Sequence, residues 1–361
     1  MGDPHGVGIV GLGVISGTYL ETLTSHPGIR IVAVADLDHE RAITVAAGIA
    51  GCRALSVAEL LADPEVATVL NLTIPAAHAE IARAAVAAGK NVYGEKPLTA
   101  AFADGVDLLA TRGDAWVGAA PDTVLGTGVQ TARAVVDSGA IGRPLSAVAT
   151  WVAPGHELWH PQPDFYYRAG GGPLLDMGPY YVTSLVHLLG PVVSVVGASS
   201  RPRTVRTIGS GPRAGEEIPV EVDTHVTGVL THAGGALSTV TFSFDAVATG
   251  ASPIEVHGEL GSVSVPDPNL FDGEVRVSAL GTPGWTPIAA RAGYADAARG
   301  IGLIDFVRGH GRADGALGLH VLEIMTELLN AAADGARHDL TTTVERPDLV
   351  PLTPATEWRT P

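Results

Sequence analysis

The chain has 361 residues and a formal net charge of −16, with 22 Lys and Arg residues against 38 Asp and Glu residues. Nucleic acids and anionic membranes are bound mainly through clustered Lys and Arg, so this acidic balance argues against both as partners. The hydrophobic fraction of 46% indicates a folded protein with sizeable cores, and the length favours two domains.

Residues 1–120 alternate short apolar runs with helical patterns. We predict strands at 6–13, 29–38, 66–75 and 90–97, with helices between them at 16–27, 39–51, 56–64 and 76–89. Strands that alternate with helices form right-handed βαβ units. A doubly wound parallel sheet, buried on both faces, is therefore expected here.

The pattern changes after residue 120. A helix predicted at 128–142 is followed by runs of period-2 alternation, and a long apolar helix is predicted at about 315–334. The alternating runs are 144–152, 221–232, 236–247 and 252–265. They predict a large, mainly antiparallel open sheet in an α+β domain of residues 121–345. Residues 346–361 are expected to form an irregular C-terminal tail.

The first predicted strand runs into a glycine loop, "GLGVIS". Gly11 permits a tight turn, Gly13 lets the backbone approach a pyrophosphate, and Ser16 is small enough for close packing of helix on strand. Asp36 follows the second strand, where its carboxylate can accept hydrogen bonds from ribose hydroxyls and would repel a 2′-phosphate. These features predict a Rossmann domain that binds NAD. NADP is less favoured, although neighbouring Arg41 could tolerate its phosphate.

The segment "YGEKPLTA" contains Lys96, one of only two lysines in the chain; the other is Lys90. Arginine stays protonated and presents a broad fork, whereas lysine presents a compact charge whose pKa responds to its surroundings. We expect Lys96 to steady a transient negative charge in a reaction. We expect Lys90 to compensate the C-terminal end of a helix.

The glycine loop, "TIPAAHAEIARAAVAAGKNVYGEKP", "DSGAIG" and "GGGPLLDMG", in this order, resemble the glucose-fructose oxidoreductase, inositol dehydrogenase and MocA (Gfo/Idh/MocA) family. The resemblance covers residues 8 to about 190. It implies an NAD(P)-binding Rossmann domain and a domain for substrate binding and oligomerisation. It also implies hydride transfer at hydroxyl carbons of sugars and cyclitols, and homodimers or homotetramers that associate through the open sheet face.

The glycine loop and this resemblance together define the cofactor-binding candidates. A structural role is an equally weighted alternative for the histidine among them. The candidates are Gly11, Gly13, Val14, Ile15, Asp36, Thr73, Pro75, His78, Glu95 and Lys96.

The family's second motif maps onto Asp176, Gly178, Tyr180 and Thr183, so a tyrosine stands where the family usually has a catalytic histidine. Pro179 predicts that a regular helix begins near it, and residues four apart on a helix share one face. A phenol can move a proton if a nearby cation stabilises its phenolate. We predict Tyr180, assisted by Lys96, as the proton relay and Asp176 as an orienting residue. A packed core aromatic is the alternative role for Tyr180.

The segment "HELWH" at 156–160 matches the pattern of zinc proteases, which requires a helix. Flanking Pro154, Gly155 and Pro161 disfavour a helix, so no metal site is expected. We predict a polar, aromatic loop that contacts a sugar-like substrate; a structural surface loop is the alternative. The substrate-binding candidates are His156, Trp159, His160, Tyr167, Arg168, Asp176 and Tyr180.

The expected function is NAD-dependent hydride transfer between nicotinamide and a secondary hydroxyl carbon of a sugar, cyclitol or glycoside. One alternative is an NAD-dependent glycoside-cleaving enzyme that oxidises, eliminates and reduces again. Another is a non-catalytic sugar or nucleotide sensor. The lone Cys52 is expected to be inert. Without a signal-peptide pattern or a run of 18 apolar residues, the expected compartment is the cytoplasm.

Overall fold

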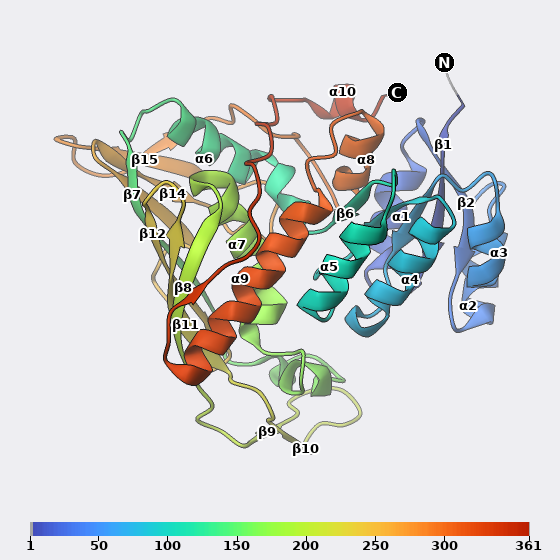
Figure 1. Cartoon of the computed structure of the whole chain (residues 1–361), viewed down its shortest axis with the longest axis horizontal. Coiled ribbons are helices and arrows are strands. Elements are labelled where there is room, and N and C mark those ends of the chain that lie inside the picture. The colour runs from blue at the N-terminus through green and yellow to red at the C-terminus, as the bar shows by residue number, and fades with distance from the viewer. Residues whose placement is uncertain (1–2, 361) are drawn as a thin grey trace. The chain divides into compact units, whose positions relative to one another are not determined.

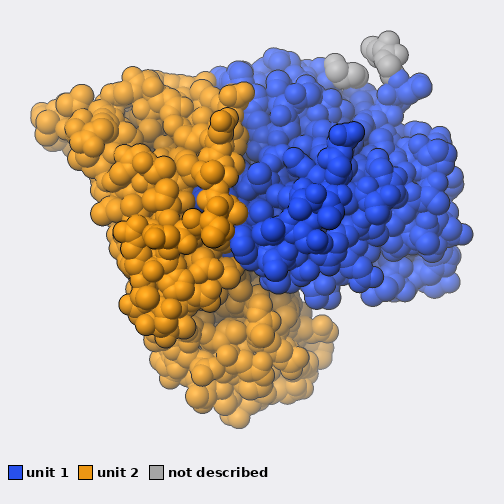
Figure 2. Space-filling model, in the orientation of Figure 1, with its two compact units in different colours: residues 1–126, 292–322, 350–361 blue, residues 127–291, 323–349 orange. Residues whose placement is uncertain are grey.

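The computed structural model describes residues 3–360 and divides into two compact units, coloured separately in Figure 2. Unit 1 comprises residues 1–126, 292–322 and 350–361, and unit 2 comprises residues 127–291 and 323–349. Two segments from the C-terminal third of the chain thus belong to the N-terminal unit. The sequence pattern, which placed a first domain at 1–120, gave no sign of this return.

The described part of unit 1 contains a parallel sheet of six strands in the order β3-β2-β1-β4-β5-β6 (Figure 1). This arrangement confirms the predicted doubly wound sheet. Its strands are β1 (His5–Val10), β2 (Ile29–Ala35), β3 (Arg53–Ala54), β4 (Thr68–Asn71), β5 (Asn91–Gly94) and β6 (Val117–Ala119). Its helices before residue 126 are α1 (Ser16–Thr24), α2 (His39–Ala47), α3 (Val57–Ala62), α4 (Pro75–Ala87), α5 (Phe102–Thr111) and the 3-10 helix η1 (Thr123–Leu125).

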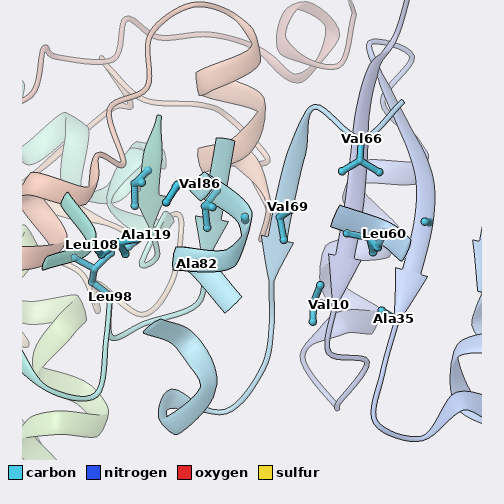
Figure 3. Packing of buried hydrophobic residues seen from close by; sticks show 14 of the residues in the cluster. Val10, Ala35, Leu60, Val66, Val69, Ala82, Val86, Leu98, Leu108 and Ala119 are labelled. Atoms are coloured by element: carbon cyan, nitrogen blue, oxygen red, sulfur yellow. The ribbon is translucent and has the colours of Figure 1, made fainter. Parts of the chain in front are cut away.

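Both faces of this sheet are covered, as two successive side chains of β5 that point to opposite faces show. Val92 belongs to a buried cluster that includes residues of α3, α4 and α5, part of which Figure 3 displays. The neighbouring Tyr93 points to the other face of the sheet. There it packs so closely on Gly302 that a Cβ added to this glycine would lie 2.4 Å from the Tyr93 hydroxyl. Removing apolar surface from water contributes roughly 25 cal/mol per Å², so this two-sided burial is a main source of stability.

The returning segments of unit 1 contain α8 (Ile301–Val307) and α10 (Ala355–Trp358). Buried Asp305 accepts hydrogen bonds from the Tyr294 hydroxyl at 2.7 Å and from Arg312 Nη1 at 2.5 Å. The Trp358 indole donates to the carbonyl of Ala295 at 2.8 Å. The tail that was predicted to be irregular therefore ends in a short helix with a buried tryptophan.

Unit 2 is built on a sheet whose described strands run in the order β16-β15-β14-β13-β7-β12-β11-β8-β17, antiparallel except where β12 pairs with β7. The predicted open and mainly antiparallel sheet is confirmed. The strands are β7 (Pro144–Val152), β8 (Val192–Ser200), β11 (His225–His232), β12 (Leu237–Ser243), β13 (Ile254–Gly258), β14 (Gly261–Val265), β15 (Val275–Ala279), β16 (Thr286–Ile288) and β17 (His338–Asp339). A separate ribbon pairs β9 (Val205–Thr207) with β10 (Glu217–Pro219).

One face of the large sheet is packed by helices, and the other face carries exposed apolar side chains. The helices of this unit are α6 (Thr127–Asp137), α7 (Pro173–Leu189) and the C-terminal part of α9 (Gly315–Asp334), with 3-10 helices η2 (His156–Leu158) and η3 (Asp164–Tyr167). Gly197 and Gly228 pair across β8 and β11, and Leu328 packs so closely on them that a Cβ on either would lie within 2.9 Å of its Cδ1. On the opposite face Val148 and Val196 are exposed.

The long helix predicted at 315–334 is α9 (Gly315–Asp334), which the structure confirms residue for residue. Of the described helices, it is the one with the length and apolar composition to cross a membrane. However, 56% of its apolar window is buried within the fold. Leu317, Ile324 and Leu328 are among its buried side chains, as expected for a core helix.

Candidate active site

The glycine loop between β1 and α1 has the shape that a pyrophosphate requires. Gly11 has φ 93°, and a Cβ added to it would lie 2.8 Å from the backbone of Leu72. At Gly13, by contrast, no heavy atom of the described residues other than Gly13 and its two chain neighbours lies within 4 Å of the Cβ position. The Ser16 hydroxyl donates to the carbonyl of Gly13 at 2.7 Å and closes the loop. The loop therefore leaves open backbone where a phosphate group can approach.

Asp36 connects the end of β2 to the glycine loop. Its Oδ2 accepts the backbone N–H of Leu12 at 2.7 Å, and its Oδ1 accepts that of Asp38 at 2.8 Å. Arg41 Nη1 lies 3.3 Å from Asp36 Oδ1, and its Nη2 lies 3.2 Å from Asp38 Oδ2. Two carboxylates thus offset the charge of Arg41, which makes it a poor partner for a 2′-phosphate. These residues fit NAD better than NADP.

Asp36→Ala is expected to weaken NAD binding roughly tenfold to a hundredfold and to reduce the difference in affinity between NAD and NADP. A charge-assisted hydrogen bond contributes about 1.5–3 kcal/mol, and the variant would also release Arg41. Titration calorimetry with NAD and NADP measures both dissociation constants without a substrate. The control is Asp38→Ser, which keeps the helix cap and Asp36, and should leave the preference for NAD in place. An unchanged NAD to NADP ratio in Asp36→Ala would contradict this role.

Three further cofactor-binding candidates lie in the loop after β4 or contact it. Thr73 donates its hydroxyl to Asn71 Oδ1 at 2.6 Å, and Pro75 is the first residue of α4. His78 is only 2% exposed, with Nδ1 at 2.7 Å from the carbonyl of Pro97 and Nε2 at 3.0 Å from that of Thr73. The imidazole therefore ties the "EKP" segment to the loop after β4. This geometry favours the structural alternative for His78.

Glu95 also acts inside the fold and holds the backbone of the catalytic candidate beside it. Its Oε1 accepts the Tyr19 hydroxyl at 2.8 Å, and its Oε2 accepts the backbone N–H of Lys96 at 3.0 Å. Burial and the nearby Glu95 carboxylate raise the pKa of Tyr19, which keeps this hydroxyl a donor. The Lys96 side chain itself is half-buried. A chain of hydrogen bonds thus runs from α1, which follows the glycine loop, to Lys96.

The second lysine has a different role from the one predicted. Lys90 is 7% exposed, and its Nζ donates to the carbonyls of Asp63 at 2.8 Å and Val66 at 2.7 Å. These acceptors belong to the loop after α3 and not to the helix that ends before Lys90. Burial lowers the pKa of its ammonium group. Lys90 is therefore a structural residue that satisfies buried carbonyls.

The helix α7 carries the second set of catalytic candidates. It begins at Pro173 and continues through Pro179, so the prediction that the regular helix begins near Pro179 is wrong. The buried apolar side chains of Leu174 and Met177 extend the packed face toward the N-terminus and outweigh the lost hydrogen bond at the proline. Asp176 and Tyr180 are both within the helix and lie one turn apart on one face. Tyr180 is buried.

The first three residues of the "HELWH" segment form the short 3-10 helix η2, and the two histidines of the segment make different contacts. His156 Nε2 lies 2.9 Å from Asp176 Oδ2, whereas His160 Nδ1 accepts the backbone N–H of Gln162. Glu157 is buried and accepts Arg206 Nη1 at 3.0 Å. No group of three or more His, Cys, Asp or Glu side chains that could hold a metal ion occurs among residues 3–360.

The other substrate-binding candidates divide into exposed and buried side chains. Trp159 and Arg168 are exposed, and the rings of Trp159 and His160 are 5.4 Å apart. Tyr167 is completely buried, and its hydroxyl donates to Glu157, so its placement contradicts a direct substrate contact. Burial raises the pKa of Tyr167. An exposed Phe165, which was not among the predicted residues, lies next to His160 at a ring distance of 5.5 Å.

Tyr19 and Asn71 in unit 1, and Arg206 in unit 2, support candidate segments within their own unit without having been predicted. Tyr19 and Asn71 hold Glu95 and Thr73, and Arg206 anchors Glu157. Each acts through a partner at least two residues away, and most partners are far away in sequence. The only local signal was the short Asn71 to Thr73 spacing, which is typical of a side-chain turn.

Two family matches agree with this architecture. Residues 5–115 match the family described as "Oxidoreductase family, NAD-binding Rossmann fold". Residues 129–264 match the "GFO/IDH/MocA C-terminal domain". Together the two matches cover more than half of the chain. The chain belongs to the Gfo/Idh/MocA oxidoreductase family.

Individual members of the Gfo/Idh/MocA family resemble parts of this chain. Inositol 2-dehydrogenase 3 from Saccharopolyspora erythraea is 34% identical over 145 residues, covering 39% of this chain and 43% of that relative. A dTDP-3,4-didehydro-2,6-dideoxy-alpha-D-glucose 3-reductase from Streptomyces antibioticus is 32% identical over 191 residues, covering 52% and 57%. The matches thus span about half the length of these curated relatives.

Among solved structures, a levoglucosan dehydrogenase in complex with NADH and L-sorbose has a TM-score of 0.77 at 22% identity. The match covers 94% of this chain and 100% of that chain. At this identity the likeness shows the fold alone. The predicted Gfo/Idh/MocA family, the α/β fold and NAD as the cofactor of the N-terminal domain are confirmed.

Proposed function

We propose that this protein is an NAD-dependent dehydrogenase or reductase that acts on a secondary hydroxyl carbon of a sugar, cyclitol or glycoside. The observation that carries the proposal is that one chain has both a loop suited to NAD and Lys96, Asp176 and Tyr180 in the family's motif positions. The names of the curated relatives, an inositol dehydrogenase and a deoxysugar reductase, support this substrate class. All of these substrates offer a ring carbon that can alternate between alcohol and ketone.

In the proposed mechanism, bound NAD supplies the acceptor or donor of the hydride. The open backbone at Gly13 and the Asp36 carboxylate would hold the cofactor. Tyr180 would exchange the proton of the substrate hydroxyl, and the Lys96 ammonium would stabilise the phenolate or alkoxide that forms. Asp176 would accept a hydrogen bond from the substrate. Because the cofactor would accept or donate the hydride, the tasks left to Tyr180, Lys96 and Asp176 are orientation of the substrate and proton transfer.

The test is a panel of sugars, cyclitols and glycosides incubated with purified protein and NAD or NADP, followed by absorbance of the reduced nicotinamide. The expected result is NAD reduction with at least one polyol or sugar, or NADH oxidation with the matching ketone. Glycoside cleavage without accumulated NADH would indicate the alternative cycle of oxidation, elimination and re-reduction. Absence of both signals across the panel would overturn the enzymatic proposal in favour of a sensor.

We further propose that the protein forms a homodimer or homotetramer through the exposed face of the large sheet. Val196, Val229, Thr239 and Val148 lie side by side in the register of β8, β11, β12 and β7. Val148 and Val196 are each 41% exposed, and Leu237 on the same sheet is also exposed. Several exposed apolar side chains grouped on one face of a sheet are typical of subunit interfaces. Sedimentation velocity measures the oligomeric state directly, and a monomer at all concentrations would contradict the proposal.

A further inference from the structure

His156 and Asp176 form a side-chain pair that motif positions alone did not reveal. His156 lies in η2, after β7, and Asp176 lies in the first turn of α7. His156 Nε2 is 2.9 Å from Asp176 Oδ2. His156 is 8% exposed, and the Asp176 side chain is 18% exposed. A histidine therefore contacts Asp176 in this chain, although position 180, where the family usually has its catalytic histidine, is a tyrosine.

The surroundings of the imidazole determine which nitrogen carries its proton. His156 Nδ1 is buried and has no hydrogen-bond partner among residues 3–360. A buried donor without a partner is costly, and an N–H on Nδ1 would be such a donor. A proton on Nε2, by comparison, is donated directly to the Asp176 carboxylate. The pair is therefore an Nε2–H donor and a carboxylate acceptor.

Aromatic side chains and a buried ion pair hold the imidazole in place. Its ring lies 5.1 Å from that of Trp159, 4.5 Å from that of Tyr166 and 4.7 Å from that of Phe244. The next residue, Glu157, is fixed by Arg206, whose Nη2 also donates to Asp245 Oδ1 at 2.5 Å. A side chain enclosed in this way cannot swing away, so it presents its Nε2–H in one direction.

We infer that His156 is a positioning residue that fixes the rotation of the Asp176 carboxylate. The inference rests on the proposed function, in which Asp176 accepts a hydrogen bond from the substrate hydroxyl. By occupying Oδ2, the imidazole sets the plane of the carboxylate and thereby the direction in which its other oxygen is presented. Because its Nε2–H is donated to Asp176 and its Nδ1 is buried, His156 acts through Asp176 and not on the substrate.

Two variants that both carry a side-chain amide, but differ in length, distinguish the positioning role from simple packing. His156→Gln places an amide N–H near the position of Nε2, whereas the side chain of His156→Asn is one methylene shorter and reaches only the position of Nδ1. With the best substrate of the panel, His156→Asn should lower kcat at least tenfold, with less than a threefold change in the dissociation constant of NAD. His156→Gln should recover kcat to within about threefold of the parent protein. Thermal unfolding of both variants shows whether each is folded.

Each result decides a different point. Equal kcat in the parent protein and His156→Asn would overturn the positioning role while leaving the proposed function intact. Equal losses in both variants would also overturn it, because packing alone would then explain the effect. A parent protein without activity on the whole panel would overturn the proposed function and the positioning role with it. If neither variant folds, a ¹⁵N spectrum of the parent protein that shows His156 protonated on Nδ1 would overturn the inference, and protonation on Nε2 alone would support it.

Discussion

Lys96→Met should lower kcat at least a hundredfold, while the dissociation constant of NAD changes less than threefold. The variant keeps the length of the side chain and removes the ammonium that is proposed to stabilise negative charge on Tyr180 or the substrate. Proton transfer and charge stabilisation of this kind contribute roughly 10²–10⁴ in rate. Lys96→Arg retains a positive charge but presents a broader planar group, so its kcat should remain at least tenfold below that of the parent protein.

The chain offers a matched control in its only other lysine. Lys90→Met leaves the carbonyls of Asp63 and Val66 without their buried donor, which should lower the free energy of unfolding by about 2–4 kcal/mol. Its kcat should stay unchanged at a temperature where the variant is folded. Steady-state kinetics and chemical denaturation measure the two effects separately. Parent-like kcat in Lys96→Met would remove Lys96 from the mechanism.

Tyr180→Phe is expected to lower kcat at least tenfold while NAD still binds. Phenylalanine fills nearly the same volume, so the buried helix face of α7 should stay packed and only the hydroxyl is lost. The matched control is Tyr181→Phe in the next position of the helix. The Tyr181 hydroxyl donates to Asp267 at 3.3 Å, and its ring packs edge-on against Phe242 at 5.6 Å. Loss of that hydroxyl should cost about 1 kcal/mol of stability and leave kcat unchanged.

Kinetics of the two tyrosine variants, with titration of NAD by calorimetry, distinguish chemistry from packing. A large loss of kcat in Tyr180→Phe together with a parent-like Tyr181→Phe supports the proton relay. Near-normal turnover in Tyr180→Phe would assign the proton to another group, with Lys96 or His160 as the next candidates. Comparable losses in both variants would instead point to a packing defect of α7.

Features that depend on local patterns could be predicted from the sequence. The glycine loop is one example, because Gly11, Gly13 and Ser16 lie within six residues and each has a separate steric reason for its place. Asp36 was predictable from its position after a buried strand. The period of apolar residues also gave the limits of α9. In each case the physical cause lies within one or two neighbouring elements.

Features that depend on distant partners could not be predicted. Nothing near His156 in the sequence indicates that it meets Asp176, and the "HELWH" letters pointed toward a different chemistry. The returning segments are held to the N-terminal part of unit 1 by Asp122, which accepts the backbone N–H groups of Gly300 and Gly302, and by His26, whose Nε2 lies 2.9 Å from the carbonyl of Trp358. These partners are far apart in the sequence, and only the fold brings them together. Pro179 gave a misleading signal because a helix with a long buried face can accommodate a proline that an isolated helix would not.

The two lysine environments have a practical consequence for covalent chemistry. Lys90 is enclosed, with two carbonyls bound to its Nζ, whereas the Lys96 side chain is half-buried. Acylating and reductive-alkylating reagents should therefore modify Lys96 well before Lys90. Of the two lysine side chains, such a reagent would mainly label the one at the proposed reaction centre, and NAD should protect it from modification. For the same reason, immobilisation of this protein through lysine side chains would tether it by the very group that turnover is proposed to require.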